Sequence, residues 1–131
     1  MNREVAGFSE FEAMATGSTE GQAAVLLAVG EAGEWTKQRT LPFPDGYGVI
    51  YTSFEEVPRH VGKPGGPLLV ISPILALGFD CIDLAQLLCR LNFPGAYRAV
   101  AEALPNPGMI RREIRDLCPK LDFDIITARE E

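Results

Sequence analysis

Few side chains in this 131-residue chain have the types and spacing that catalysis or ligand binding needs. The single histidine, His60, would serve acid–base catalysis or zinc binding beside a carboxylate or thiol, but no recognisable motif supplies one. Gly30–Gly33 follows an apolar segment as a phosphate-binding turn would, yet it lacks the third glycine of a dinucleotide site and the lysine of an ATP loop. We therefore interpret His60 as a helix-terminal surface residue and Gly30–Gly33 as an ordinary turn.

The three cysteines have no spacing typical of a metal site. They are Cys81, Cys89 and Cys118. Their odd number favours reduced, mostly buried thiols in a cytoplasmic protein. A reactive Cys81 is the alternative, because this residue lies near the expected start of a helix, where the helix dipole can lower a thiol pKa. The sequence predicts neither a metal nor a cofactor.

Composition and charge narrow the class of protein. The chain is 47% hydrophobic and 23% charged, as globular proteins are, and its length suits one domain. Its net charge of −6 argues against nucleic acid and anionic membranes as partners. No apolar run approaches the roughly 20 residues that cross a bilayer, and the first residues lack the apolar core of a secretory signal. We expect a cytoplasmic protein with one domain over residues 22–128, preceded by a flexible or partly helical arm over residues 1–21.

The clearest structural signal is Gly66–Leu91. Its elements must position any functional side chains in the centre of the fold. The apolar run Leu68–Ile71 behind a Gly-Pro breaker predicts a strand covered on both faces, and Pro73 ends it. Asp80 is a good N-cap for the segment that follows. Four leucines there share helical spacing: Leu84, Leu87, Leu88 and Leu91. A strand followed directly by a helix indicates a parallel sheet of the α/β class.

The other predicted elements extend this pattern in both directions. Further strands are expected at Ala23–Val29, with a helix as the minority alternative, and at Tyr47–Thr52, Ala96–Val100 and Leu121–Ile125. Residues 31–41 fit a helix or a strand. The element order predicts a small doubly wound, mostly parallel five-stranded sheet with three α/β/α layers.

Two more helices have recognisable start signals. Ser53 and Glu56 form a capping-box pattern before a short helix over Phe54–His60. Asn106 followed by proline begins another helix, which ends at Cys118.

In this order of elements the chain resembles a response-regulator receiver domain, loosely over Ala23–Thr127. The best local match is the apolar strand, the loop LALGFDCIDL and the leucine helix that ends at Arg90-Leu91. The Leu104-Pro105 and Asn106-Pro107 pairs before a helix also occupy a similar place. The resemblance implies a flavodoxin-like five-stranded sheet and a role in signalling.

The residues of phosphotransfer do not match those of receivers. Ser72 stands where a receiver carries its phosphate-accepting aspartate, and only Glu31, with Glu34 three residues on, stands near the place of the acidic Mg²⁺-binding pair. Ala99–Val100 replaces the switch serine or threonine, and Lys120 lies next to a different loop pattern from that of the receiver lysine. The resemblance therefore implies a degenerate receiver without phosphotransfer chemistry.

A basic cluster offers a surface for protein contacts. Its arginines and the neighbouring strand residues are Arg111, Arg112, Arg115, Asp122 and Phe123. Arginine is enriched in protein interfaces, and the corresponding region of receivers is the usual dimer face. The first hypothesis is thus a non-catalytic receiver-like regulatory or protein-interaction domain, forming a homodimer or binding a protein partner.

The alternative hypothesis is a small-molecule-binding domain or an enzyme. Doubly wound sheets bind ligands in the crevice at the carboxyl ends of their strands. Glu31, Ser72 and Asp80 would line that crevice, and they are too few to name a reaction or a ligand.

Overall fold

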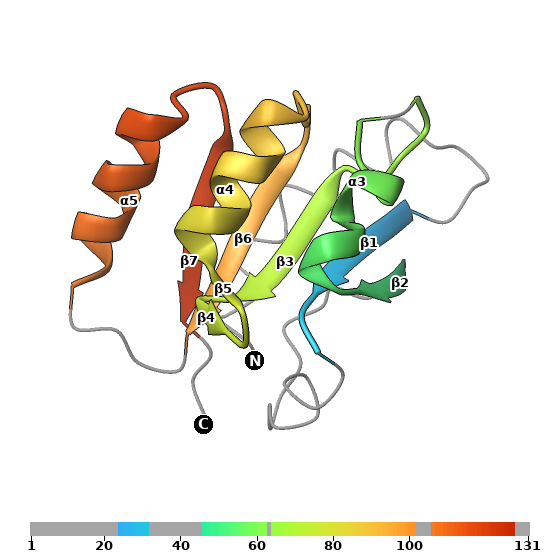
Figure 1. Ribbon diagram of the computed structural model, residues 1–131, viewed down its shortest axis with the longest axis horizontal. Helices are drawn as coiled ribbons and strands as arrows, with labels where there is room; N and C mark the ends of the chain where they lie inside the picture. The colour runs from blue at the N-terminus through green and yellow to red at the C-terminus, as the bar shows by residue number, and fades with distance from the viewer. Residues whose placement is uncertain (1–23, 32–45, 63, 102–105, 128–131) are drawn as a thin grey trace.

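The computed structural model describes residues 24–31, 46–62, 64–101 and 106–127. Five strands form one sheet in the order β2-β1-β3-β6-β7, and every neighbouring pair is parallel (Figure 1). The strands are β1 (Ala24–Val29), β2 (Tyr47–Thr52), β3 (Leu69–Pro73), β6 (Ala96–Ala101) and β7 (Asp122–Thr127). The predicted α/β class and five-stranded parallel sheet are confirmed.

The described helices cover one face of this sheet (Figure 1). They are α3 (Val57–His60), which follows the 3-10 turn η2 (Phe54–Glu56), α4 (Cys81–Arg90) and α5 (Pro107–Leu117). From β2 through β3 and β6 to β7, the chain advances across the sheet in one direction, so right-handed crossovers place all three helices on the same side. Leu84 and Leu88 of α4 and Ile114 of α5 are buried against strand residues there.

The opposite face of the sheet is equally apolar. Its buried residues are Leu26, Ala28, Leu69, Ile71, Ala96, Val100 and Ile126. Burial on both faces explains why these strands are nearly continuous hydrophobic runs in the sequence. Because no described helix lies on this second face, the predicted three-layer packing stays a prediction.

The link between β3 and α4 contains an element that the sequence analysis took for a loop. Here β4 (Leu75–Ala76) and β5 (Phe79–Asp80) pair as an antiparallel hairpin. Gly78 in its turn has φ +90°, a conformation that costs glycine little and other residues much. Asp80 then caps α4, as predicted.

The predicted capping box at Ser53 is wrong. The Ser53 side chain makes no capping hydrogen bond, and Glu56 forms an ion pair with Arg59 instead, with 2.8 Å between Oε1 and Nε. The first turn is a 3-10 helix, and Pro58 lies in the first turn of α3. In this 3-10 turn the Glu56 N–H donates to the Ser53 carbonyl oxygen, 3.1 Å away. The Ser53 hydroxyl is therefore not required as an acceptor for that N–H.

Two predicted segments lie outside the described residues. These are the arm over residues 1–21 and all but the first residue of the segment 31–41. Among the helices that are described, none is long and apolar enough to cross a membrane.

Candidate functional site

The carboxyl ends of the parallel strands meet at one edge of the sheet, which we call the carboxyl edge. The predicted crevice residues lie along it at different depths. Glu31 follows β1 and is exposed, Asp80 precedes α4 and is half-buried, and Ser72 is near the end of β3 with 0% of its surface exposed. Ser72 is therefore part of the core, and it does not line a surface crevice.

Ser72 is held by two hydrogen bonds inside the protein. Its Oγ lies 2.8 Å from the Pro73 carbonyl oxygen, to which it donates, and 2.6 Å from the Tyr97 hydroxyl. A serine hydroxyl has one hydrogen, so the Tyr97 O–H must donate to the Ser72 oxygen. Both side chains are fully buried, and burial raises the pKa of Tyr97 well above its usual value. The result is a sealed pair of neutral hydroxyls at the carboxyl end of β3.

Tyr97 was not among the residues that the sequence analysis selected. It packs against Phe123 of β7, with ring centroids 5.3 Å apart and planes inclined by 55°. Phe123, predicted as an interface residue, is consequently half-buried on the inner side of the edge strand. The available signal was a tyrosine in the short mixed segment AYRAV, which was predicted to be a strand. A buried tyrosine usually finds a partner for its hydroxyl.

The carboxylate of Asp80 is used to begin α4. Asp80 Oδ1 accepts from the Asp83 N–H at 2.9 Å, and Asp83 Oδ2 accepts from the Asp80 N–H at 3.1 Å. This reciprocal arrangement satisfies two backbone donors at the helix start. Glu31 is thus the one exposed member of the predicted crevice set.

Two of the three thiols, those of Cys81 and Cys118, have raised pKa values. Burial, together with the Asp80 carboxylate, raises the pKa of Cys81 to about 11. Burial, together with the neighbouring Cys89, raises the pKa of Cys118 to about 11 as well. Both therefore stay protonated near neutral pH, and thiols react as thiolates. All three cysteines are free, and the prediction of mostly buried thiols is confirmed. Among the described residues, no group of three or more histidine, cysteine or acidic side chains is arranged to hold a metal ion.

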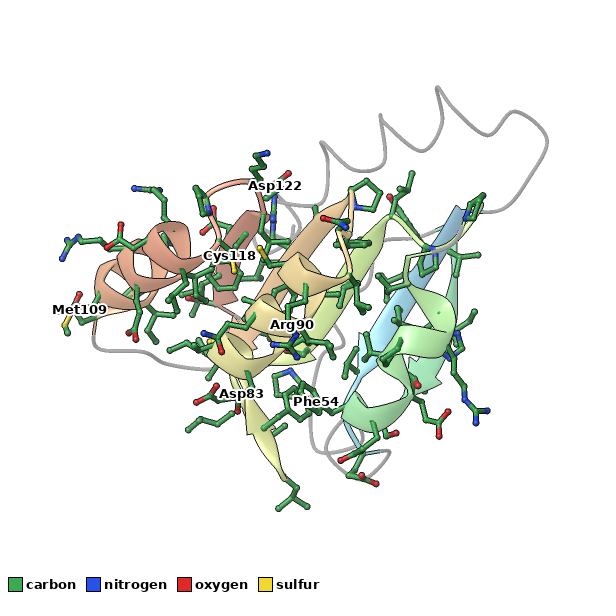
Figure 2. All side chains as sticks on the ribbon, turned by 45° about the horizontal axis from the view of Figure 1, so that its top comes forward. Phe54, Asp83, Arg90, Met109, Cys118 and Asp122 are labelled. Atoms are coloured by element: carbon green, nitrogen blue, oxygen red, sulfur yellow. The ribbon has the colours of Figure 1, made fainter. Side chains whose placement is uncertain are left out.

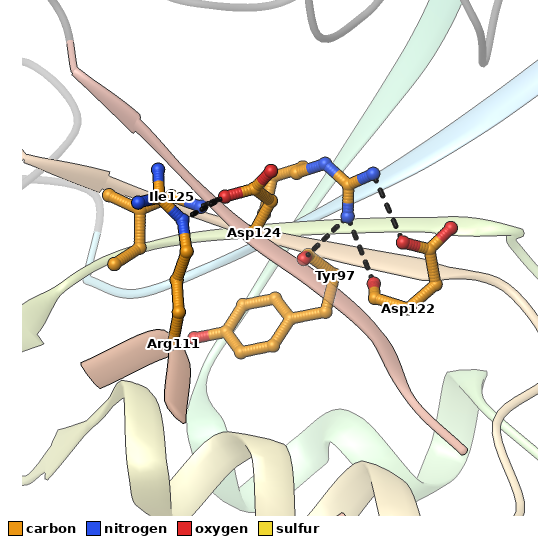
Figure 3. A network of polar contacts seen from close by, with 6 residues as sticks. Tyr97, Arg111, Asp122, Asp124 and Ile125 are labelled. Atoms are coloured by element: carbon orange, nitrogen blue, oxygen red, sulfur yellow. Dashed lines mark hydrogen bonds and ion pairs between the residues drawn. The ribbon is translucent and has the colours of Figure 1, made fainter. Parts of the chain in front are cut away.

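Two arginines tie β7 to its surroundings, and both contacts are drawn in Figure 3. Arg98 of β6 is only 5% exposed and donates through Nη1 to the carbonyl oxygens of Tyr97, 3.1 Å, and Asp122, 2.9 Å. Its Nη2 lies 3.2 Å from Asp122 Oδ1. Asp122, the acid of the predicted interface set, is therefore already paired within the chain.

The second contact uses another predicted interface residue. Arg111 of α5 donates through Nε to Asp124 Oδ1 at 2.5 Å (Figure 3). Partial burial alone would raise the pKa of Asp124, but the hydrogen bonds from Arg111 and the Ile125 N–H and the charges of Arg111 and Arg98 outweigh it. The pKa of Asp124 is consequently below its ordinary value. Arg112 and Arg115, in contrast, are exposed on α5.

Comparisons with family models, curated proteins and solved structures find no match to this chain. The function must therefore be inferred from the geometry of the site. That geometry contains a buried hydroxyl pair, a capped helix start, protonated thiols and an ion-paired edge strand. None of these four features presents a reactive group to solvent.

Proposed function

We propose that this chain is a receiver-like regulatory domain that lacks phosphotransfer chemistry and acts by contacting other proteins, a second copy of itself included. The strand order supports the receiver-like part of the proposal. Numbered along the chain, the five strands lie in the order 2-1-3-4-5, which is the order of flavodoxin-like sheets. The three described helices cover the face that right-handed crossovers assign to them in that order.

The main support for the proposed loss of phosphotransfer is the pair of hydroxyls, Ser72 and Tyr97, at the end of β3. An acyl phosphate forms on an ionised carboxylate that can reach the phosphoryl donor and Mg²⁺. Ser72 offers a neutral hydroxyl that is fully buried and already bonded to Tyr97 at 2.6 Å. A phosphoryl group would have to displace the tyrosine from the core to reach it.

Exposed apolar side chains support a role in protein contacts. Leu75 and Leu77 of the hairpin are 74% and 73% exposed, and Met109 near the start of α5 is also largely exposed. Isolated exposed apolar residues are ordinary, but two of the largest exposures on one short hairpin suggest a surface that another molecule covers.

The test uses a phosphoryl mimic and a phosphoryl donor. With Mg²⁺ and beryllium fluoride, the amide resonances of Ser72 and its neighbours in isotope-labelled protein should not shift beyond the effect of Mg²⁺ alone. Incubation with a small-molecule acyl phosphate should leave the intact mass unchanged. Specific shifts at Ser72, or a gain of one phosphoryl group, would contradict the proposal.

A further inference from the structure

The carboxyl edge combines exposed apolar side chains with negative charge. The hairpin that carries Leu75 and Leu77 projects at the end where the arrows of β3 and β7 terminate (Figure 1). Helix α5 begins at this same edge because it follows the carboxyl end of β6. Met109, which is labelled in Figure 2, lies near the start of α5. Three exposed apolar side chains therefore lie at one end of the molecule.

The described acids of this edge each follow a strand or begin a helix there. They are Glu31 after β1, Glu55 and Glu56 after β2, and Asp80 and Asp83 at the start of α4. The Phe54–Phe79 stack, with centroids 4.9 Å apart, holds η2 and hence Glu55 beside the hairpin. Arg59, three residues after Glu56, is paired with it. The carboxyl edge is thus apolar and acidic.

The opposite end of the molecule, which we call the amino edge, has the reverse charge. Helices α4 and α5 end there, with Arg90 and Arg115 exposed in their last turns, and exposed Lys120 lies shortly before β7. Two exposed acids among the described residues, Asp116 and Asp122, are nearby, and Asp122 is already paired with the buried Arg98. Leu68 before β3 and Leu117 at the end of α5 are both nearly half exposed. The amino edge is therefore apolar and basic.

We propose that copies of this chain associate head to tail, with the carboxyl edge of one copy on the amino edge of the next. This inference rests on the proposed function and names a second copy as the partner. Opposite charges then face each other around apolar side chains, whereas a twofold contact between two carboxyl edges would oppose like charges. Since each copy has both surfaces, the contact is heterologous, and the assembly grows beyond a dimer.

The first measurement is the mass of the wild-type protein by light scattering as its concentration rises. At low salt the average mass should increase past that of a dimer. Raising the ionic strength from about 0.1 M to 1 M shortens the screening length from about 10 Å to about 3 Å, so the association should weaken. A monomer at every concentration would overturn the self-contact.

Variants at the two edges give the sharper test. The carboxyl-edge variant Leu75→Ser/Leu77→Ser and the amino-edge variant Arg90→Glu/Arg115→Glu should each weaken self-association at least tenfold, equivalent to about 1.4 kcal/mol. Mixed together, the two variants should form a one-to-one dimer and stop, because each keeps one intact surface. Arg112→Glu reverses a charge in the middle of α5, between the edges, and should leave the association unchanged.

The outcomes separate this inference from the proposed function. A mixture that fails to pair, or an assembly that resists both variants, overturns the head-to-tail contact. If a double variant loses its circular-dichroism spectrum, Leu75→Ser alone and the salt series on the wild type decide the question. A monomer without a fluoride response at Ser72 would refute the self-contact and leave the loss of phosphotransfer standing.

Discussion

The hydrogen bond between Ser72 and Tyr97 can be tested by a double-mutant cycle. The two residues are 25 positions apart in the chain, and their hydroxyls meet at 2.6 Å with no solvent access. The single changes are Ser72→Ala and Tyr97→Phe, and the third variant combines them. Each removes a hydroxyl and keeps the shape of the side chain close to the original.

The direction of donation makes the two single changes unequal. Ser72→Ala leaves the buried Tyr97 O–H without an acceptor, a loss of about 1–3 kcal/mol in the free energy of unfolding. Tyr97→Phe removes one bond but orphans no donor, because the Ser72 hydroxyl still donates to the Pro73 carbonyl. Its expected cost is about 0.5–1.5 kcal/mol. In the Ser72→Ala background, Tyr97→Phe should be neutral or stabilising, since it removes the orphaned hydroxyl.

Urea unfolding, monitored by far-ultraviolet circular dichroism, measures the free energy of unfolding of the wild type and the three variants. The double variant should be less destabilised than the sum of the single variants by more than about 0.5 kcal/mol. Additive effects within that margin would refute a direct bond between the two hydroxyls. A larger loss for Tyr97→Phe than for Ser72→Ala would refute the assigned direction of donation.

Two further predictions concern the glycines and the ion-paired edge strand. Gly95→Ala should destabilise the fold by about 1–3 kcal/mol, because its Cβ would lie 2.1 Å from the Leu68 carbonyl oxygen. Gly108→Ala, whose Cβ would meet nothing nearer than 3.8 Å, should stabilise α5 by up to about 0.5–1 kcal/mol. Thermal unfolding compares the two variants, and stability changes of the same sign would contradict this assignment. Because the folded-state pKa of Asp124 is lowered, its stabilising effect is present above the ordinary carboxyl pKa and is lost as pH falls through the folded value. Asp124→Asn should therefore flatten the acid limb of the pH–stability curve, and an unchanged limb relative to wild type would show that the Arg111 pair contributes nothing.

The strands and the main helix could be predicted because their signals are local. The runs in β1 and β3 are apolar at successive positions, as strands buried on both faces require, and both strands lie inside the sheet. The start of α4 was equally readable, since Asp80 caps it and the leucines behind it repeat at helical spacing. The Ser53 pattern failed although it was also local, because a 3-10 turn removes the need for the cap.

The candidate site was much less predictable. Ser72 was selected as a surface residue because its type and its place at the end of a strand suggested a crevice. Its burial depends on Tyr97, which the β3–β6 register brings to it from another strand. Arg98 was overlooked for a similar reason, since its partner Asp122 is 24 residues away.

By itself, the sequence determined the class of the fold, the five strands and the start of α4, because hydrophobic periodicity and capping act between residues close together in the chain. It also determined that Ser72 stands at the end of β3. Only the tertiary structure decided that this serine is sealed by Tyr97 and that Arg98 and Arg111 hold β7. Those outcomes follow from strand order and register, which bring distant residues together and which no local pattern specifies.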